Sequence, residues 1–206
     1  MILFINKINM ENNTRNAKIE TWFPKSIFSS MNFLSNSELN NLIEQTEKQL
    51  TLGTKKTGML QVNSTHQTNN FINLPEFDFF KEKILEAVNG FAEALGYTEK
   101  QRETMHFNNM WANESNEGSY LAPHVHAGSL FSGAFYLMAP PNAKITFFNE
   151  ITNMLAEPLN ENPLNFSLVK YDCIPNSLLL FKSDFVHGNE YQTAGRKIVI
   201  SFNLSL

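Results

Sequence analysis

The second half of the chain consists of short apolar segments separated by clusters of turn-forming residues. From Thr104 onward these segments are MHFNNMWAN, APHVHAGSLFSGAFYL, KITFFNE, FSLVKYDCI, SLLLFKSDFVHG and RKIVISFNLSL. The sequences between them, such as ESNEGS, APPNA, NENP and PNS, are rich in residues that favour turns. Six or more short strands of this kind predict a β-sandwich or a barrel.

Two amphipathic helices are expected before these strands. Ser35 and Glu38 form the S-x-x-E capping box of a helix that ends near Gly53. A second helix is expected after Pro75, with Gly96 at its C-terminal cap. Its apolar face contains Phe80, Ile84, Val88, Phe91 and Leu95. Because such a face must be buried, we expect both helices to pack on one outer face of the sheet.

The 206 residues are expected to form one compact domain with three parts. Residues 1–20 are predicted to be a polar tail, residues 21–103 a helical support region, and residues 104–206 the β-rich catalytic core. Within the support region, TWFPKSIF is expected to be an edge strand because it contains Pro24. A hairpin strand is expected around Met59–Val62.

Charge and composition exclude several classes of protein. A net charge of −4 without a basic stripe argues against nucleic-acid binding. No apolar run reaches the roughly 18 residues that cross a bilayer, and the N-terminus lacks a signal-peptide pattern. The single Cys173 excludes an internal disulfide framework. We therefore expect a cytoplasmic protein.

Three of the five histidines have the spacing of a metal site. In a strand, residues i and i+2 share a face, so His124 and His126 are expected to project from one strand end toward one ion. His187 ends another predicted strand and is expected to complete the site. His66 and His106 stand alone and are expected to be ordinary polar side chains. Neutral imidazoles suit Fe, Zn, Cu or Ni.

With these motifs in place, the sequence resembles the non-haem Fe(II), 2-oxoglutarate-dependent oxygenases. It is most similar to the 2OG-Fe(II) oxygenase family of bacteria and phages, within the prolyl-4-hydroxylase-like branch. The resemblance is carried by WFPKSIF, the W-x-N of residues 111–113, PHVHAGSLFSGAFYL, and LLLFKSDFVHG followed by KIVISFN. It implies a mainly β, cupin-like double-stranded β-helix, or jelly roll, with two supporting helices on its larger sheet.

The resemblance also implies roles for the three histidines. His124 matches the first metal ligand and His187 the distal one. His126 occupies the position where the superfamily usually has a carboxylate, so the acid of the facial triad is replaced. Asp184 and Glu190 are the acids nearest to His187 in the sequence, and neither matches a family ligand.

The cosubstrate requires a cation that holds its distal carboxylate. Lys197 and Arg196 are the two candidates, and because they are adjacent on a strand only one can point inward. We favour Lys197, since it shares a face with Val199, Ser201 and Asn203, whereas Arg196 shares one with Ile198, Ile200 and Phe202. By resemblance, Tyr136 is expected to contact the same carboxylate, and Asn113 the cosubstrate or the metal-bound water.

The implied activity is hydroxylation of an unactivated C–H bond with Fe(II) as cofactor and 2-oxoglutarate and O₂ as cosubstrates, releasing succinate and CO₂. The implied substrate is a peptide, an amino acid or another small molecule, with Trp111 as a candidate for the lining of its pocket. Because edge strands often pair, we also expect a homodimer.

Two alternatives remain open from the sequence. A three-histidine cupin-type metalloenzyme would bind metal without responding to 2-oxoglutarate. A non-enzymatic jelly-roll binding or structural protein would lose only stability when His124 or His187 is replaced.

Overall fold

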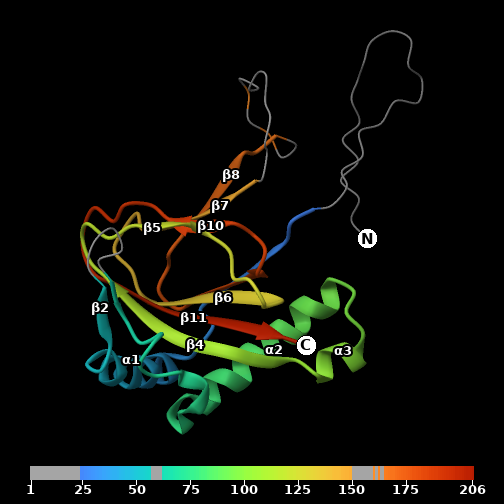
Figure 1. The fold of residues 1–206 in the computed structure, drawn as a ribbon, viewed down its shortest axis with the longest axis horizontal. Helices are drawn as coiled ribbons and strands as arrows, with labels where there is room; N and C mark the ends of the chain where they lie inside the picture. The colour runs from blue at the N-terminus through green and yellow to red at the C-terminus, as the bar shows by residue number, and fades with distance from the viewer. Residues whose placement is uncertain (1–23, 57–61, 150–159, 161, 163–164) are drawn as a thin grey trace.

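The computed structural model describes residues 24–56, 62–149, 160, 162 and 165–206, which form two β-sheets and a layer of helices (Figure 1). The larger sheet has the strand order β1-β9-β6-β11-β4-β3-β2, and the smaller sheet has the order β5-β10-β7-β8. Figure 1 shows the helices beneath the larger sheet and the smaller sheet above it. The predicted mainly β fold with helices on one outer face is confirmed.

Along the second half of the chain most consecutive strands lie in different sheets, while β7 and β8 follow each other within the smaller sheet. Two predicted strand segments each divide into two strands, because a turn in the middle takes the chain from one sheet to the other. In the larger sheet the strands are β1 (Ile27–Met31), β2 (Thr54–Lys56), β3 (Val62–Ser64), β4 (His106–Ser115), β6 (Phe131–Met138), β9 (Ser177–Lys182) and β11 (Lys197–Ser205). In the smaller sheet they are β5 (Leu121–His124), β7 (Lys144–Phe148), β8 (Leu168–Asp172) and β10 (His187–Asn189).

The region before residue 104 contributes strands as well as helices. At one edge of the larger sheet, β1 pairs with β9, and at the other edge the β2–β3 hairpin pairs with β4. The predicted edge strand begins later than expected, at Ile27. Of the strand expected around Met59–Val62, only Val62 is described, and the predicted tail 1–20 lies outside the described residues.

The caps predict the start of the first helix and the end of the second, whereas the first helix ends at Leu50, before Gly53, and the second begins at Asp78 without a side-chain cap. In α1 (Asn36–Leu50), the Ser35 hydroxyl accepts a hydrogen bond from the Glu38 N–H at 3.4 Å, and the Glu38 carboxylate accepts one from the Ser35 N–H at 2.8 Å. Gly96 follows α2 (Asp78–Ala94) with a φ of +88°, which glycine adopts at low cost. Short 3-10 helices at Phe71–Asn73 and Pro75–Phe77 precede α2, and an additional short helix, α3 (Glu99–Glu103), follows it.

The main core lies between the helices and the larger sheet. Phe135 of β6 lies at its centre, with its ring centroid 5.1 Å from that of Phe80 on α2 and 5.8 Å from that of Phe33. A second apolar cluster, which includes Phe147 and Phe181, lies between the two sheets. Among the described residues, no helix is both long and apolar enough to cross a membrane.

Candidate metal centre

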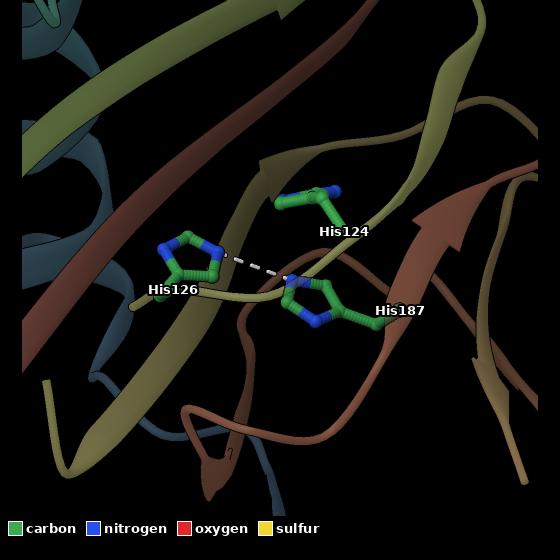
Figure 2. A group of neighbouring side chains, drawn as sticks. All are labelled: His124, His126 and His187. Carbon is green, nitrogen blue, oxygen red and sulfur yellow. Dashed lines mark hydrogen bonds between the residues drawn. The ribbon is translucent and has the colours of Figure 1, made fainter. Parts of the chain in front are cut away.

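Three histidine side chains converge at one end of the smaller sheet (Figure 2). His124 is the last residue of β5 and His187 the first of β10, and the antiparallel register places their Cα atoms opposite each other. One ligand nitrogen from each of His124, His126 and His187 lies within 4.8 Å of the others. The Nε2 atoms of His126 and His187 are 3.2 Å apart. Two nitrogens bound at a right angle to one ion, each about 2.1 Å from it, would be about 3 Å apart.

His126 reaches this centre from a loop, so the prediction that it projects from the same strand as His124 is wrong. The strand ends at His124, because the chain turns there to leave the smaller sheet for the larger one. The loop is held by its backbone: the His126 N–H donates to the Ser183 carbonyl at 2.9 Å. The prediction that His187 ends a strand is also wrong, since β9 ends at Lys182 and His187 begins β10.

Backbone carbonyls orient two of the imidazoles. The Nδ1–H of His124 donates to the Ala122 carbonyl at 2.9 Å, and that of His187 donates to the Phe185 carbonyl at 2.8 Å. These bonds fix the tautomer that leaves the Nε2 lone pair available as a ligand. Gly188 follows His187, and a Cβ at this position would lie 2.7 Å from the Leu121 carbonyl oxygen. Glycine therefore allows β10 to approach β5 closely beside the site.

Burial keeps two of the ligands neutral. It lowers the pKa of His126 to about 4 and that of His187 to about 3, and the neighbouring histidines add to both shifts. The hydrogen bond from His187 to the Phe185 carbonyl acts in the opposite direction but is weaker than the effect of burial on the pKa. Both imidazoles are therefore unprotonated at neutral pH, which is the form that binds metal.

Within the described part of the chain, no carboxylate joins the three histidines. Of the two acids nearest to His187 in the sequence, Asp184 is exposed, and Glu190 is exposed and paired with Lys170. The donor set is therefore three neutral imidazole nitrogens on one side of an open space. Such a set fits a first-row divalent ion such as Fe(II), and it leaves room for further ligands from solution.

A cavity of about 290 Å³ extends from the histidines between the two sheets. Four of the residues predicted for a cosubstrate or substrate line it, whereas Arg196 does not. On β11 the lining residues are Lys197, Val199, Ser201 and Asn203, while the alternate residues Ile198, Ile200 and Phe202 belong to the helix-facing core. The other predicted residues in the lining are Trp111, Asn113 and Tyr136.

The two candidate cations have opposite surroundings. The Lys197 side chain is 4% exposed, no carboxylate among the described residues pairs with it, and burial lowers the pKa of its ammonium group. Arg196 instead makes a bidentate ion pair with Glu47 of α1 at 2.7 and 3.1 Å. It also donates through Nε to Glu114 of β4 at 2.5 Å, and these partners raise its pKa. Lys197 is thus the cation that faces the cavity.

Tyr136 lies in the cavity wall together with Lys197. Its side chain is 2% exposed, and burial, with a smaller effect from the Cys173 thiol, raises the pKa of its phenol. The phenol is therefore a neutral hydrogen-bond donor at physiological pH.

One of the wall residues that sequence reasoning missed is a histidine. His66 follows β3 and lines the cavity, with its ring centroid 4.6 Å from that of Trp111 in an edge-on contact. Trp111 in turn has its centroid 6.0 Å from that of His126. A lone histidine in a polar loop gives no sequence signal of such a position, because only the β3–β4 pairing brings it to the site.

Comparisons with known proteins agree with this geometry. Residues 109–203 match the family model described as "Putative 2OG-Fe(II) oxygenase". No curated protein matches the sequence.

Three solved structures illustrate the similarity of fold. The viral collagen prolyl hydroxylase of Paramecium bursaria Chlorella virus-1, solved as a 2-oxoglutarate complex, is 16% identical with a TM-score of 0.58, covering 87% of this chain and 96% of that chain. HygX of Streptomyces hygroscopicus, solved with nickel, 2-oxoglutarate and hygromycin B, is 12% identical with a TM-score of 0.61, covering 88% and 83%. A Pseudomonas putida prolyl-4-hydroxylase is 10% identical with a TM-score of 0.60, covering 88% and 94%.

The fold and the site first define a class, the double-stranded β-helix proteins, here with three clustered histidines that could hold a metal ion. Within that class, residues 109–203, which contain the three histidines and Lys197, match the model of the 2OG-Fe(II) oxygenase family. Fe(II) and 2-oxoglutarate are the cofactor and cosubstrate of this enzyme family. The recognition of the family from the sequence is confirmed.

Proposed function

We propose that the protein is an Fe(II)- and 2-oxoglutarate-dependent oxygenase that hydroxylates an unactivated C–H bond of an organic substrate, releasing succinate and CO₂. His124, His126 and His187 would hold the iron through their Nε2 atoms. The bound iron would supply the activation of O₂, coupled to oxidative decarboxylation of 2-oxoglutarate. A cytoplasmic location and assembly as a homodimer are two further predictions from the sequence.

The observation that carries the proposal is Lys197. A buried ammonium group without a paired carboxylate costs free energy, and its cost is offset when an anion enters the cavity. The distal carboxylate of 2-oxoglutarate would be that anion, with Lys197 as the charged donor and the Tyr136 phenol as the neutral one. Asn113, which lines the same cavity, would donate its amide N–H to the cosubstrate or to metal-bound water.

The test is an anaerobic titration of the metal-free protein with Fe(II) and then with 2-oxoglutarate, followed by visible absorption. We expect a weak charge-transfer band when both are bound. His187→Ala is expected to remove the band by weakening iron binding on the order of 100-fold or more. His106→Ala is the matched control, because this exposed histidine begins β4 outside the cavity lining, and it is expected to leave the band unchanged.

The same titration separates the two alternatives. Iron binding without a band would support a three-histidine metalloenzyme that does not use 2-oxoglutarate. Absence of iron binding would contradict an iron-dependent activity and would favour a binding or structural protein.

A further inference from the structure

The described lining of the cavity contains basic side chains and no carboxylate. Its described lining contains Lys197 and four histidines, and it contains no aspartate or glutamate. The acids closest to this end of β11, Glu47 and Glu114, are engaged by Arg196 and do not line the cavity. The cavity therefore has no negative charge of its own among the described residues.

This imbalance persists after the expected ligands have bound. Three neutral imidazole ligands add no charge to the site. Fe(II) and the Lys197 ammonium together would carry three positive charges, and the two carboxylates of 2-oxoglutarate carry two negative charges. The net charge is therefore +1. A carboxylate in the position of His126 would have cancelled that excess. In a partly enclosed cavity an uncompensated positive charge favours the entry of an anion and opposes the entry of a cation.

One part of the cavity lining lies away from Lys197. Trp111 lies opposite Ser201, and from Lys197 to Ser201 the strand advances roughly 13 Å. His66 packs edge-on against Trp111 and is the one exposed side chain in the described lining, so it marks the entrance. The His66–Trp111 wall therefore lies beside the metal ligand His126, at a distance from the cosubstrate cation.

We propose that the primary substrate of this cavity carries an anionic group, a carboxylate or a phosphate, and that it enters along the wall formed by His66 and Trp111. The inference rests on the proposed function and adds the charge class of the substrate. His66 is its specificity-determining residue, because its imidazole packs against Trp111 at the entrance that the anion would pass. Trp111 supplies a flat apolar surface for the remainder of the molecule.

The experiment uses the anaerobic complex of the protein with Fe(II) and 2-oxoglutarate, whose charge-transfer band reports events beside the iron without turnover. Acetate and inorganic phosphate are the anionic probes, acetamide is the neutral probe and methylammonium the cationic one. We expect acetate, phosphate or both to shift the band at concentrations about tenfold lower than acetamide, and methylammonium to have no effect. A response to acetate alone identifies a carboxylate, and a response to phosphate alone a phosphate.

Variants at the entrance provide the second readout. His66→Glu is expected to weaken the binding of the anionic probes by about tenfold, because it introduces a negative charge at the entrance. His106→Glu is the matched control with the same charge change at a remote exposed histidine, and it is expected to change the affinity by less than about twofold. Thermal unfolding of both variants verifies that they are folded.

Several results would overturn the inference. These are equal responses to acetamide and acetate, a stronger response to methylammonium, equal effects of the two glutamate variants, or displacement of 2-oxoglutarate by the anion. A band that forms normally but shows no anion preference defeats this inference alone. Failure of the band to form at all defeats the proposed function, and this inference with it.

Discussion

The two faces of β11 use the same stretch of chain for opposite purposes. Toward the helices, Ile198, Ile200 and Phe202 are buried among apolar side chains. Toward the cavity, Lys197 is buried without a carboxylate partner among the described residues. The first face stabilises the fold, and the second presents polar side chains to the cavity. Under the proposed function, stability and binding are separated residue by residue along this strand. Each prediction below acts either on the helix side or on the cavity side of the larger sheet.

The largest expected effect comes from the helix-facing core. Phe135→Ala removes a fully buried ring that contacts Phe33 and Phe80, and we expect it to lower the free energy of unfolding by about 4 kcal/mol. Urea denaturation measures the loss. If the protein remains folded, its affinity for 2-oxoglutarate should change by less than about threefold. A loss of affinity without a loss of stability would contradict the separation of the two faces.

Replacement of Lys197 is expected to change binding and stability in opposite directions. Lys197→Met should weaken 2-oxoglutarate binding by about 10- to 100-fold, because a charge-assisted hydrogen bond is lost. It should also raise the stability of the metal-free protein by about 1 kcal/mol, because a buried ammonium without a carboxylate partner is removed. Absorption titration and urea denaturation test the two effects. A variant that loses stability would assign Lys197 a structural role.

The cavity face should make the stability of the metal-free protein depend on pH. The pKa values of His126 and His187 are lowered to about 4 and about 3, whereas an unfolded histidine has a pKa near 6.5. Below pH 6.5 the unfolded chain therefore binds protons that the folded chain does not. Stability should be fully present above pH 7 and fall by on the order of 2 kcal/mol by pH 5, after discounting for the partial exposure of His126.

Urea denaturation in a metal-free buffer at several pH values measures this loss. In the double variant His126→Gln/His187→Gln the slope between pH 7 and pH 5 should largely disappear. An unchanged slope would assign the pH dependence to other groups.

The smallest effect is expected from the ion pair on the helix side. Glu47→Gln removes the bidentate partner of Arg196, and because both side chains are partly exposed it should cost less than about 1 kcal/mol. Arg196→Gln should likewise leave 2-oxoglutarate affinity within about twofold of the parent. A large loss of cosubstrate binding in Arg196→Gln would instead make Arg196 the carboxylate partner.

The sequence predicts the fold well where one local signal determines each element. The capping box of Ser35 and Glu38 and the glycine cap at Gly96 define helix ends by short-range chemistry. The period-two alternation of β11, continued to Arg196 immediately before the strand, separates the faces of Lys197 and Arg196 in the same way. These features require no knowledge of distant contacts.

The parts that sequence reasoning missed depend on how distant segments meet. The pair His124 and His126 satisfies strand spacing, but whether β5 continues to His126 is decided by the turn that leads into β6 and by the hydrogen bond to Ser183. His66 reaches the cavity only through the pairing of β3 with β4. A pattern within one segment does not contain such contacts.

The position of the histidines also has a consequence for the stability of the fold. His124 and His187 are separated by a long stretch of chain but lie opposite each other in β5 and β10, and His126 belongs to a loop beside them. An ion held by all three would act as a removable cross-link across these segments, comparable to a disulfide that solution conditions open and close. Above the dissociation constant, each tenfold rise in free metal would add about 1.4 kcal/mol to the free energy of unfolding.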